Sequence, residues 1–237
     1  MKDISIVLLP GLDGTGTLFK PMMRFLPAWI KPVVVSYPVD KPYGYEDLME
    51  IVRNAIPWDN EFIILGESFS GPLAIMTAAE KPDGLLGVIL CATFAKNPFK
   101  FIPSWVSPLS VSPIYALWPA TIKLRAICVG GRFKNFVNMA LDAVKTVHPR
   151  AISARVKAIL KVNVRPLFEK IDVPVLYMAS RKDHLIKKHN VIDLKTAKPE
   201  LEVIELNTKH FLLQLEPERS AEIITDFIKK IREPPYY

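Results

Sequence analysis

One serine in this sequence stands where an apolar run meets a helix-forming stretch. Ser68 is the third residue of Gly-Glu-Ser-Phe-Ser-Gly, which occupies positions 66–71 directly after the apolar run Phe62–Leu65. A sharp turn that presents a nucleophile between a strand and a helix needs small neighbours, because larger side chains would collide with both elements. The two glycines and Ser70 satisfy that need, although glycine is the more usual residue at position 70. The pattern predicts a nucleophilic Ser68 rather than a serine in an ordinary turn.

A serine hydroxyl needs a base to take its proton and a third group to orient that base. His210 lies between the last expected strand and the last expected helix, at the edge of a parallel sheet where ligands bind. Asp183 begins the loop after the preceding strand, whereas Asp172 comes before that strand and belongs to the opposite edge. The other three histidines are interpreted as polar surface residues. The sequence therefore predicts a triad of Ser68, His210 and Asp183.

A glycine-rich loop after the first apolar run can supply backbone N–H groups to a developing oxyanion. Its sequence, Pro-Gly-Leu-Asp-Gly-Thr-Gly at positions 10–16, lets the chain turn its N–H groups inward. We expect one donor to be the N–H of Leu12 and the other to be that of Phe69, directly after the nucleophile. The alternative is a phosphate-binding loop. The glycine spacing does not fit Gly-x-Gly-x-x-Gly, however, and no Gly-Lys-Ser/Thr follows.

Apolar runs of strand length alternate with helical stretches along the chain. This alternation is typical of a mostly parallel sheet covered by helices on both faces. The expected strands are Ile4–Leu9, Val33–Tyr37, Phe62–Leu65, Gly87–Cys91, Val173–Met178 and Leu201–Leu206. The expected helices are Thr17–Leu26, Tyr45–Ala55, Pro72–Glu80, Ala151–Val162 and Pro217–Ile231.

The alternation breaks between Asn97 and Pro149. Prolines recur about every five residues in the first half of this segment, so no long regular element fits there. The second half contains two helical stretches, Leu124–Val129 and Phe133–Val147, separated by a glycine pair. An insertion of some fifty residues is long for a connection and is typical of a lid. We expect its many aromatic residues to anchor it, and a few of them to line an apolar acyl pocket.

These features resemble the α/β-hydrolase superfamily over nearly the whole chain. Positions 66–71 match its nucleophile elbow, positions 180–183 look like its acid loop, and positions 210–217 look like its histidine loop. The sequence departs from the family at Pro10, where many members have histidine, at Ser70 and at Lys209, without losing a catalytic group. The resemblance implies an α/β-hydrolase fold, with a core of residues 1–98 and 149–237 and a small inserted helical lid of residues 99–148.

The composition fits a globular α/β protein and excludes several other classes. Half of the 237 residues are hydrophobic and 23% are charged, which is too apolar for a disordered chain. No apolar stretch approaches the roughly 20 residues of a membrane span, and the first run is too short for a signal peptide. We therefore expect a cytoplasmic protein without a membrane span. Cys91 and Cys128 are interpreted as buried thiols, and no cluster has zinc spacing, so neither a metal nor a cofactor is expected.

The net charge of +7 comes from one segment of the chain. Between Lys96 and Arg165 there are 12 basic residues and one acidic residue, Asp142. A solvated basic face and a surface that steers an acidic partner both explain this excess. Nucleic acid is not expected, because no nucleic-acid-binding motif accompanies the charge. In size, lid placement and basic lid, the chain is similar to the pimeloyl-carrier-protein methyl ester esterases of biotin synthesis. That likeness implies an acidic acyl carrier protein as a partner.

The expected function is hydrolysis of a small-molecule or carrier-linked carboxylic ester with a hydrophobic acyl group, through an acyl-enzyme on Ser68. A pimeloyl-carrier-protein methyl ester is one candidate substrate. Dehalogenases and epoxide hydrolases of the superfamily use a carboxylate nucleophile, so the serine argues against both. Four alternatives stay open on the same fold. They are a thioesterase, an acyltransferase, a lyase that uses the triad for proton transfer, and a binding protein without catalysis.

Overall fold

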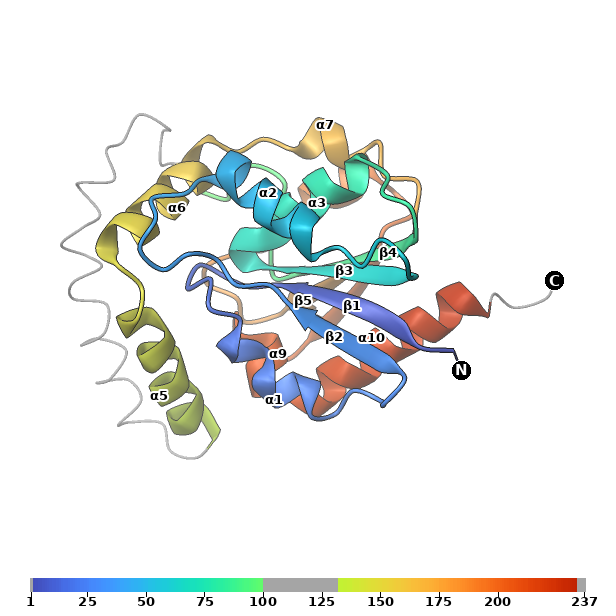
Figure 1. The fold of residues 1–237 in the computed structure, drawn as a ribbon, viewed down its shortest axis with the longest axis horizontal. Helices are drawn as coiled ribbons and strands as arrows, with labels where there is room; N and C mark the ends of the chain where they lie inside the picture. Colours follow the sequence, from blue (N-terminus) through green and yellow to red (C-terminus); the bar gives the residue numbers. More distant parts are fainter. Residues whose placement is uncertain (1, 100–131, 234–237) are drawn as a thin grey trace.

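A six-stranded parallel sheet forms the centre of the molecule (Figure 1). The computed structural model describes residues 2–99 and 132–233. The sheet has the strand order β2-β1-β3-β4-β5-β6, and every neighbouring pair is parallel. The strands are β1 (Ile4–Leu9), β2 (Ile30–Val34), β3 (Phe62–Glu67), β4 (Leu85–Cys91), β5 (Val175–Ser180) and β6 (Glu202–Leu206). The parallel sheet that the alternation predicted is confirmed.

The strand sequences explain their order in the sheet. All six residues of β3 and all but one residue of β1, β4 and β5 are buried, which suits central strands covered on both faces. The two outer strands are more polar and more exposed. β2 also contains Pro32, which an edge strand tolerates because one of its sides has no pairing partner.

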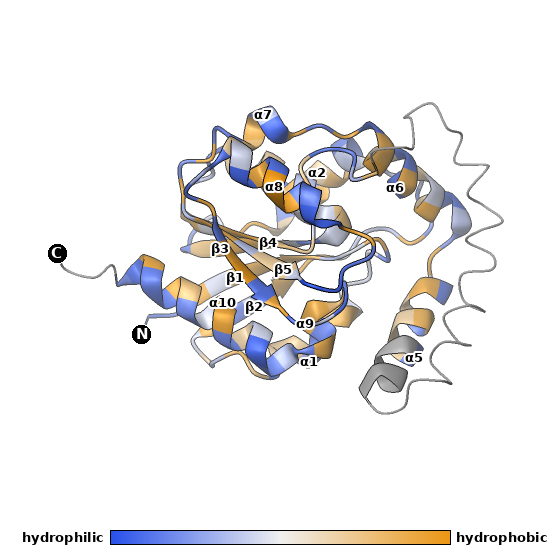
Figure 2. Ribbon diagram, turned by 180° about the vertical axis from the view of Figure 1, so that it is seen from behind, coloured by the Kyte–Doolittle hydropathy of each residue, from blue (hydrophilic) through white to orange (hydrophobic). Residues whose placement is uncertain are grey.

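Helices cover both faces of the sheet, as expected. One face carries α2 (Tyr45–Ala55), α3 (Gly71–Ala79), α7 (Arg165–Phe168) and α8 (Lys188–Ala197). The other face carries η1 (Thr17–Phe19), α1 (Lys20–Met23), α9 (Leu212–Leu215) and α10 (Pro217–Arg232). α10 is amphipathic, with apolar residues along one side and hydrophilic residues along the other (Figure 2).

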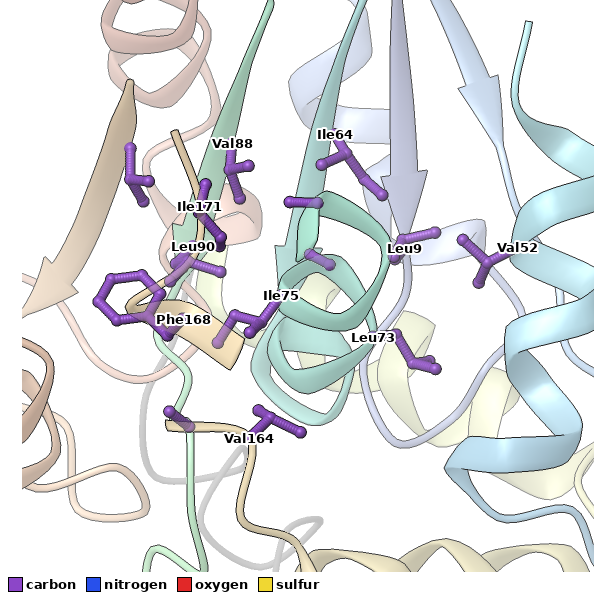
Figure 3. Close-up of a cluster of buried hydrophobic side chains, with 14 of the residues drawn as sticks. Leu9, Val52, Ile64, Leu73, Ile75, Val88, Leu90, Val164, Phe168 and Ile171 are labelled. Carbon is purple, nitrogen blue, oxygen red and sulfur yellow. The ribbon is translucent and has the colours of Figure 1, made fainter. Parts of the chain in front are cut away.

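Two apolar cores lie on the two faces of the sheet. In the first, side chains from β3, β4 and α3 meet those of α7 and the chain after it (Figure 3). Leu73 and Ile75 of α3, Leu90 of β4 and Phe168 of α7 are all wholly buried there. This packing fixes α3 against β3, so the turn that joins them is held from both sides.

The structure corrects two of the expected boundaries. The second strand begins at Ile30 rather than Val33, because it pairs with β1 from Ile30 to Val34 and then leaves the sheet. Beyond it, the N–H of Tyr37 donates to the carbonyl of Gly14 in the loop after β1. The helix expected at Thr17–Leu26 is shorter, because η1 and α1 together end at Met23. This early end is consistent with Pro27, since proline disfavours helical backbone in the residue before it.

Helices α5 (Arg132–Lys145) and α6 (Pro149–Lys161) lie beyond the carboxyl ends of the strands (Figure 1). α5 corresponds to the helix expected at Phe133–Val147, and α6 to that at Ala151–Val162. The expected helix at Leu124–Val129, Cys128 and most of the expected lid lie outside the described residues. The division into a core and a lid of residues 99–148 stays a prediction. In the described part of the chain, no helix is both long and apolar enough to cross a membrane.

Candidate active site

Ser68 lies at a sharp turn between β3 and α3, as the sequence predicted. Its φ angle is 49°, in the left-handed region that non-glycine residues rarely adopt, and η2 (Ser68–Ser70) leads from it into α3. A Cβ atom on Gly66 would come within 2.6 Å of the Ser70 carbonyl oxygen. A Cβ atom on Gly71 would come within 2.0 Å of the Thr93 side chain. The turn therefore has no room for larger residues at either glycine.

The three side chains predicted as a triad are joined by hydrogen bonds. Ser68 Oγ lies 2.8 Å from His210 Nε2, and His210 Nδ1 lies 2.7 Å from Asp183 Oδ2. The other Asp183 oxygen accepts the N–H groups of Leu185 and Ile186, at 2.8 and 2.9 Å. A carboxylate only accepts, so His210 carries its proton on Nδ1 and leaves Nε2 free to take the proton of Ser68.

Neighbouring strand ends bring Asp183 and His210 together. β5 and β6 are adjacent and parallel, so the loops that follow them leave the same edge of the sheet. The Lys182 N–H donates to the Thr208 carbonyl at 3.0 Å, and the Ser180 hydroxyl donates to the same carbonyl. These bonds hold the acid loop against the histidine loop, and the Asp183 and His210 side chains are 3% and 9% exposed.

The histidines and the aspartate that the sequence set aside lie elsewhere. His148 caps α6 by accepting the Arg150 N–H, and the ring of His189 contacts the Pro98 carbonyl oxygen at 3.1 Å. His184 is exposed. Asp172 forms an exposed ion pair with Lys81. None of these four joins the hydrogen bonds between Ser68, His210 and Asp183 in the described part of the chain.

Buried hydroxyl groups that sequence analysis did not select hold the backbone of the turn. The Thr93 hydroxyl donates to the Ser68 carbonyl, and the Thr93 N–H and carbonyl both bond the Tyr177 hydroxyl. The Tyr45 hydroxyl donates to the Phe69 carbonyl at 2.8 Å, and the two rings stack with centroids 4.8 Å apart. Burial raises the pKa of both tyrosines, so both remain neutral donors.

One expected oxyanion donor follows Ser68 in the chain, and the other lies in a loop that passes beside Ser68. The Gly11 carbonyl accepts the Gly14 N–H at 3.0 Å, and the peptide between Gly11 and Leu12 is trans. The Leu12 N–H therefore points away from that turn, and it bonds no acceptor in the described part of the chain. A Cβ on Gly11 would lie 4.0 Å from the Ser68 Cβ, so the loop passes beside the nucleophile. The Phe69 N–H belongs to the first turn of η2, where no intrahelical acceptor exists.

Glu67, the residue before the nucleophile, is buried beside the triad. Burial raises its pKa from 4.5 to about 7, while the hydrogen bond from Gln214 opposes the shift. Gln214 Nε2 donates to Glu67 Oε1 at 2.9 Å. The Gln214 Oε1 atom is buried and has no hydrogen-bond partner among the described residues. A protonated Glu67 carries the O–H donor that this amide oxygen lacks.

Two cavities among the described residues do not have Ser68 in their lining. One of about 180 Å³ lies beside Asp183, between β5 and α8, and the other lies between α8 and β6. Neither is lined by Ser68 or His210, so neither is assigned to the acyl group. Among the described residues, no group of three or more histidine, cysteine or acidic side chains is arranged to hold a metal ion.

Comparison with known proteins identifies the fold. No protein-family model matches the chain, and no curated protein sequence matches it. A carboxylesterase structure from the ammonia-oxidizing thaumarchaeon Nitrososphaera gargenis is similar with a TM-score of 0.81 and 14% identity, over 98% of this chain and 92% of that one. The enol-lactonase of Burkholderia xenovorans LB400 is similar with a TM-score of 0.80 and 18% identity, over 96% and 92%. An esterase from Exiguobacterium antarcticum is similar with a TM-score of 0.79 and 15% identity, over 96% of this chain and 92% of that one. The chain has the α/β-hydrolase fold.

Proposed function

We propose that this protein is a serine hydrolase that cleaves carboxylic esters. The observation that carries the proposal is the continuous hydrogen-bond chain from Ser68 through His210 to Asp183, built on a left-handed turn residue. The esterases and the lactonase that share the fold support ester chemistry. The fold alone hosts many reactions, so the residues at the site decide between them.

The geometry supports a two-step acyl transfer. His210 Nε2 takes the Ser68 proton as Oγ bonds to the ester carbonyl carbon, and the carbonyl oxygen becomes an oxyanion held by the N–H groups of Leu12 and Phe69. The tetrahedral intermediate collapses, the C–O bond to the alcohol breaks, and the His210 proton passes to the leaving oxygen. Water then attacks the acyl-enzyme with His210 as its base, which releases the acid and restores the Ser68 hydroxyl.

Apolar residues near the triad support a hydrophobic acyl group. Phe211 packs edge-on against His210, with ring centroids 5.1 Å apart. Leu141 and Met139 of α5 form a cluster with Phe211 and Leu215. The proposed acyl pocket would use this cluster as one wall, since ligand sites are mostly apolar with a few directed polar groups.

An acidic acyl carrier protein is proposed as a partner on the evidence of exposed charge. Arg150, Lys157 and Lys161 of α6 are exposed, and none of them has an ion pair within the described residues. Arg155 belongs to the same basic run of the sequence but is wholly buried, so it cannot contribute to a steering surface. The fields of exposed cations guide acidic partners toward a site.

Hydrolysis of p-nitrophenyl esters from acetate to decanoate, with Ser68→Ala and His210→Ala beside the wild type, tests this function. Both variants are expected to lose nearly all turnover while remaining folded, and His184→Ala is the matched histidine control. Labelling of Ser68 by a fluorophosphonate is expected in the wild type and not in Ser68→Ala. A folded wild type that neither hydrolyses esters nor reacts with the fluorophosphonate would contradict the proposal and favour a binding protein.

The remaining alternatives are separated by their products. A thioesterase would turn over acyl thioesters faster than the matching oxygen esters. An acyltransferase would form a new ester or amide when an alcohol or amine is added, at the expense of free acid. A lyase would release an aldehyde or ketone without an acyl-enzyme, which mass spectrometry of the quenched protein would show.

A further inference from the structure

Arg155 is a buried cation whose guanidinium donates hydrogen bonds only to backbone carbonyl groups in the described part of the chain. The residue lies on α6 and is 0% exposed. Its Nη1 donates to the carbonyl oxygens of Leu12 and Asp13, at 2.9 and 2.8 Å, and its Nη2 donates to that of Pro38 at 3.0 Å. Its Nε is buried without a partner among the described residues. No carboxylate forms an ion pair with Arg155 among the described residues, although the charge of the nearby buried Asp13 acts on it. Withdrawing a guanidinium from water is costly, so the three carbonyl contacts need a reason.

Two of the three acceptors belong to the loop that carries the proposed oxyanion donor. The Leu12 carbonyl is held by Arg155, and the Gly11 carbonyl is held by the Gly14 N–H. The peptide groups on both sides of the Leu12 Cα atom are therefore fixed. Because the Leu12 N–H shares a plane with the Gly11 carbonyl, its direction is fixed with them.

The loop is shaped around the guanidinium. Gly14 has a φ of 71°, and a Cβ atom placed on it would come within 2.6 Å of Arg155 Nη1 and 2.9 Å of Cζ. A side chain at position 14 would therefore meet the guanidinium directly. The glycine in the loop and the arginine on α6 fit each other, although they lie far apart in the sequence.

A second buried contact ties the start of the same loop to the nucleophile turn. The Ser70 hydroxyl donates to the Pro10 carbonyl, and the Tyr37 hydroxyl lies 2.6 Å from Ser70 Oγ. The Arg155 guanidinium lies over the Tyr37 ring, 5.6 Å from its centroid. Tyr37 thus contacts both Ser70 and Arg155. Ser70 of the nucleophile turn therefore holds the first residue of the loop, and Arg155 of α6 holds its middle.

We propose that Arg155 is a positioning residue for the oxyanion hole, which acts from α6 by fixing the peptide groups that aim the Leu12 N–H at the substrate carbonyl oxygen. The inference rests on the proposed ester hydrolysis. Preorganised donors lower the barrier only when they already lie where the oxyanion forms. A loop that lost the guanidinium would sample other peptide orientations, so the transition state would lose more stabilisation than the bound ester.

The test compares Arg155→Met and Arg155→Lys with the wild type on one p-nitrophenyl ester. Removal of a whole oxyanion donor costs about 10²–10³ in kcat, and we expect a misplaced donor to cost roughly 10- to 100-fold, with KM changed by less than about twofold. Lysine places its donors on one nitrogen and cannot span the Leu12, Asp13 and Pro38 carbonyls as the guanidinium does, so partial activity is expected.

A second readout separates positioning from folding. A trifluoromethyl ketone adds to a serine nucleophile and forms a tetrahedral oxyanion, so its inhibition constant is expected to rise by about the factor by which kcat/KM falls. Ile159→Ala, a buried apolar change on the same helix, is the control that lowers stability without this effect, and Arg24→Met is the exposed control with the same change of side chain.

Two results would overturn the inference. One is a folded Arg155→Met protein with kcat and ketone affinity within twofold of the wild type. The other is an Ile159→Ala protein in which kcat and ketone affinity fall as much as they do in Arg155→Met. If Arg155→Met does not fold, the same two measurements on Arg155→Lys decide. A wild type that neither hydrolyses esters nor binds the ketone would instead contradict the proposed function, so the two failures are distinguishable.

Discussion

At the scale of single residues, the proposed chemistry depends on which nitrogen of His210 carries the proton. Asp183 controls this, because one of its oxygens faces His210 Nδ1 and the other accepts two backbone N–H groups. The carboxylate therefore has two separate tasks. It orients the imidazole, and it holds the turn of its own loop.

Asp183→Asn separates these two tasks. The asparagine oxygen can still accept the N–H groups of Leu185 and Ile186, so the loop is expected to fold as in the wild type. Its NH₂ group then faces His210 Nδ1, which places the ring proton on Nε2 and removes the base for Ser68. We expect kcat to fall by about 10³–10⁴ with little change in melting temperature. Turnover within tenfold of the wild type would remove Asp183 from the mechanism.

Glu67 gives a prediction for stability as a function of pH. Between pH 4.5 and about 7, the folded protein retains the Glu67 proton that the unfolded chain has lost, because burial raises the pKa of this carboxyl. Folding therefore takes up a proton in this window, and the free energy of unfolding decreases as the pH rises. The full shift corresponds to at most about 3 kcal/mol.

Glu67→Gln removes this titration and keeps the shape of the side chain. Its amide can accept from Gln214 Nε2 and donate to the unpartnered Gln214 Oε1. The free energy of unfolding of the variant minus that of the wild type is expected to be roughly 2–3 kcal/mol larger at pH 7.5 than at pH 4.5. Urea unfolding at several pH values measures the difference, with the exposed Glu46→Gln as control. A difference that does not change with pH would show that Glu67 is not protonated in the folded protein.

At the scale of elements, the elbow depends on how closely β3, α3 and the end of β4 approach one another. Gly71→Ala would place a methyl group against Thr93, whose hydroxyl holds the Ser68 carbonyl. We expect a loss of about 1–3 kcal/mol in stability and a fall in kcat of tenfold or more, because the nucleophile must move. Thermal unfolding and p-nitrophenyl ester hydrolysis test both effects.

Gly44→Ala is the matched control for this substitution. Its added Cβ would lie 3.9 Å from the Ala158 Cβ and 4.0 Å from Asp47 Oδ2, which is ordinary contact, and its φ is negative. Gly44 is the N-cap of α2, where glycine is favoured over alanine, so a loss of stability below about 1 kcal/mol is expected, with turnover unchanged. Equal losses in the two variants would show that the crowding at Thr93 is not the cause.

The elements that could be predicted from the sequence are those whose own residues determine them. β3 and α3 have apolar strand and helix sequences with small residues between them, and the proximity of Asp183 and His210 followed from the strand ends that carry them. The position of β2 did not follow, because its limits are set by pairing with β1 and its β-branched run extends beyond them. Local pattern carries no information about such a partner.

The supporting contacts were missed for a related reason. Arg155 sits in a basic stretch of an amphipathic helix, where its spacing from Ile152 and Ile159 places it beside the apolar face. That signal was overlooked, and the sequence does not show that the guanidinium is wholly buried against three backbone carbonyls. Thr93 and Tyr45 are ordinary in sequence and meet the elbow only through the sheet. Contacts between residues distant in the chain decide these roles, and a single sequence does not record them.

At the scale of the whole molecule, α6, which carries three exposed basic residues, lies beyond the carboxyl ends of the strands (Figure 1). The loops of Asp183 and His210 leave the sheet at that same edge. Arg150, Lys157 and Lys161 are seven and four residues apart, so they form one stripe along the helix. Such a stripe is expected to change the rate at which an acidic partner arrives far more than the proposed chemistry on Ser68, because charges at the surface act mainly on association.

Reversal of these three charges to glutamate tests whether that stripe receives a carrier protein. We expect kcat/KM for an acyl-carrier-protein methyl ester to fall tenfold or more at low ionic strength, because association with an acidic surface becomes repulsive. The matching p-nitrophenyl ester is expected to change by less than twofold, since a neutral substrate is not steered. Added salt should reduce the difference between wild type and variant for the carrier substrate.

A control with the same change in net charge removes the general effect of a less basic protein. Lys20, Arg24 and Lys229 are exposed on α1, its end and α10, on the other side of the sheet from α2 and α3. Their reversal to glutamate lowers the net charge equally, so the carrier substrate is expected to be turned over at nearly the wild-type rate. If both triple variants slow the carrier substrate alike, long-range charge and not docking on α6 accounts for the effect. If the α6 variant also slows the small ester, the stripe acts on the position of α6, and through Arg155 on the oxyanion loop.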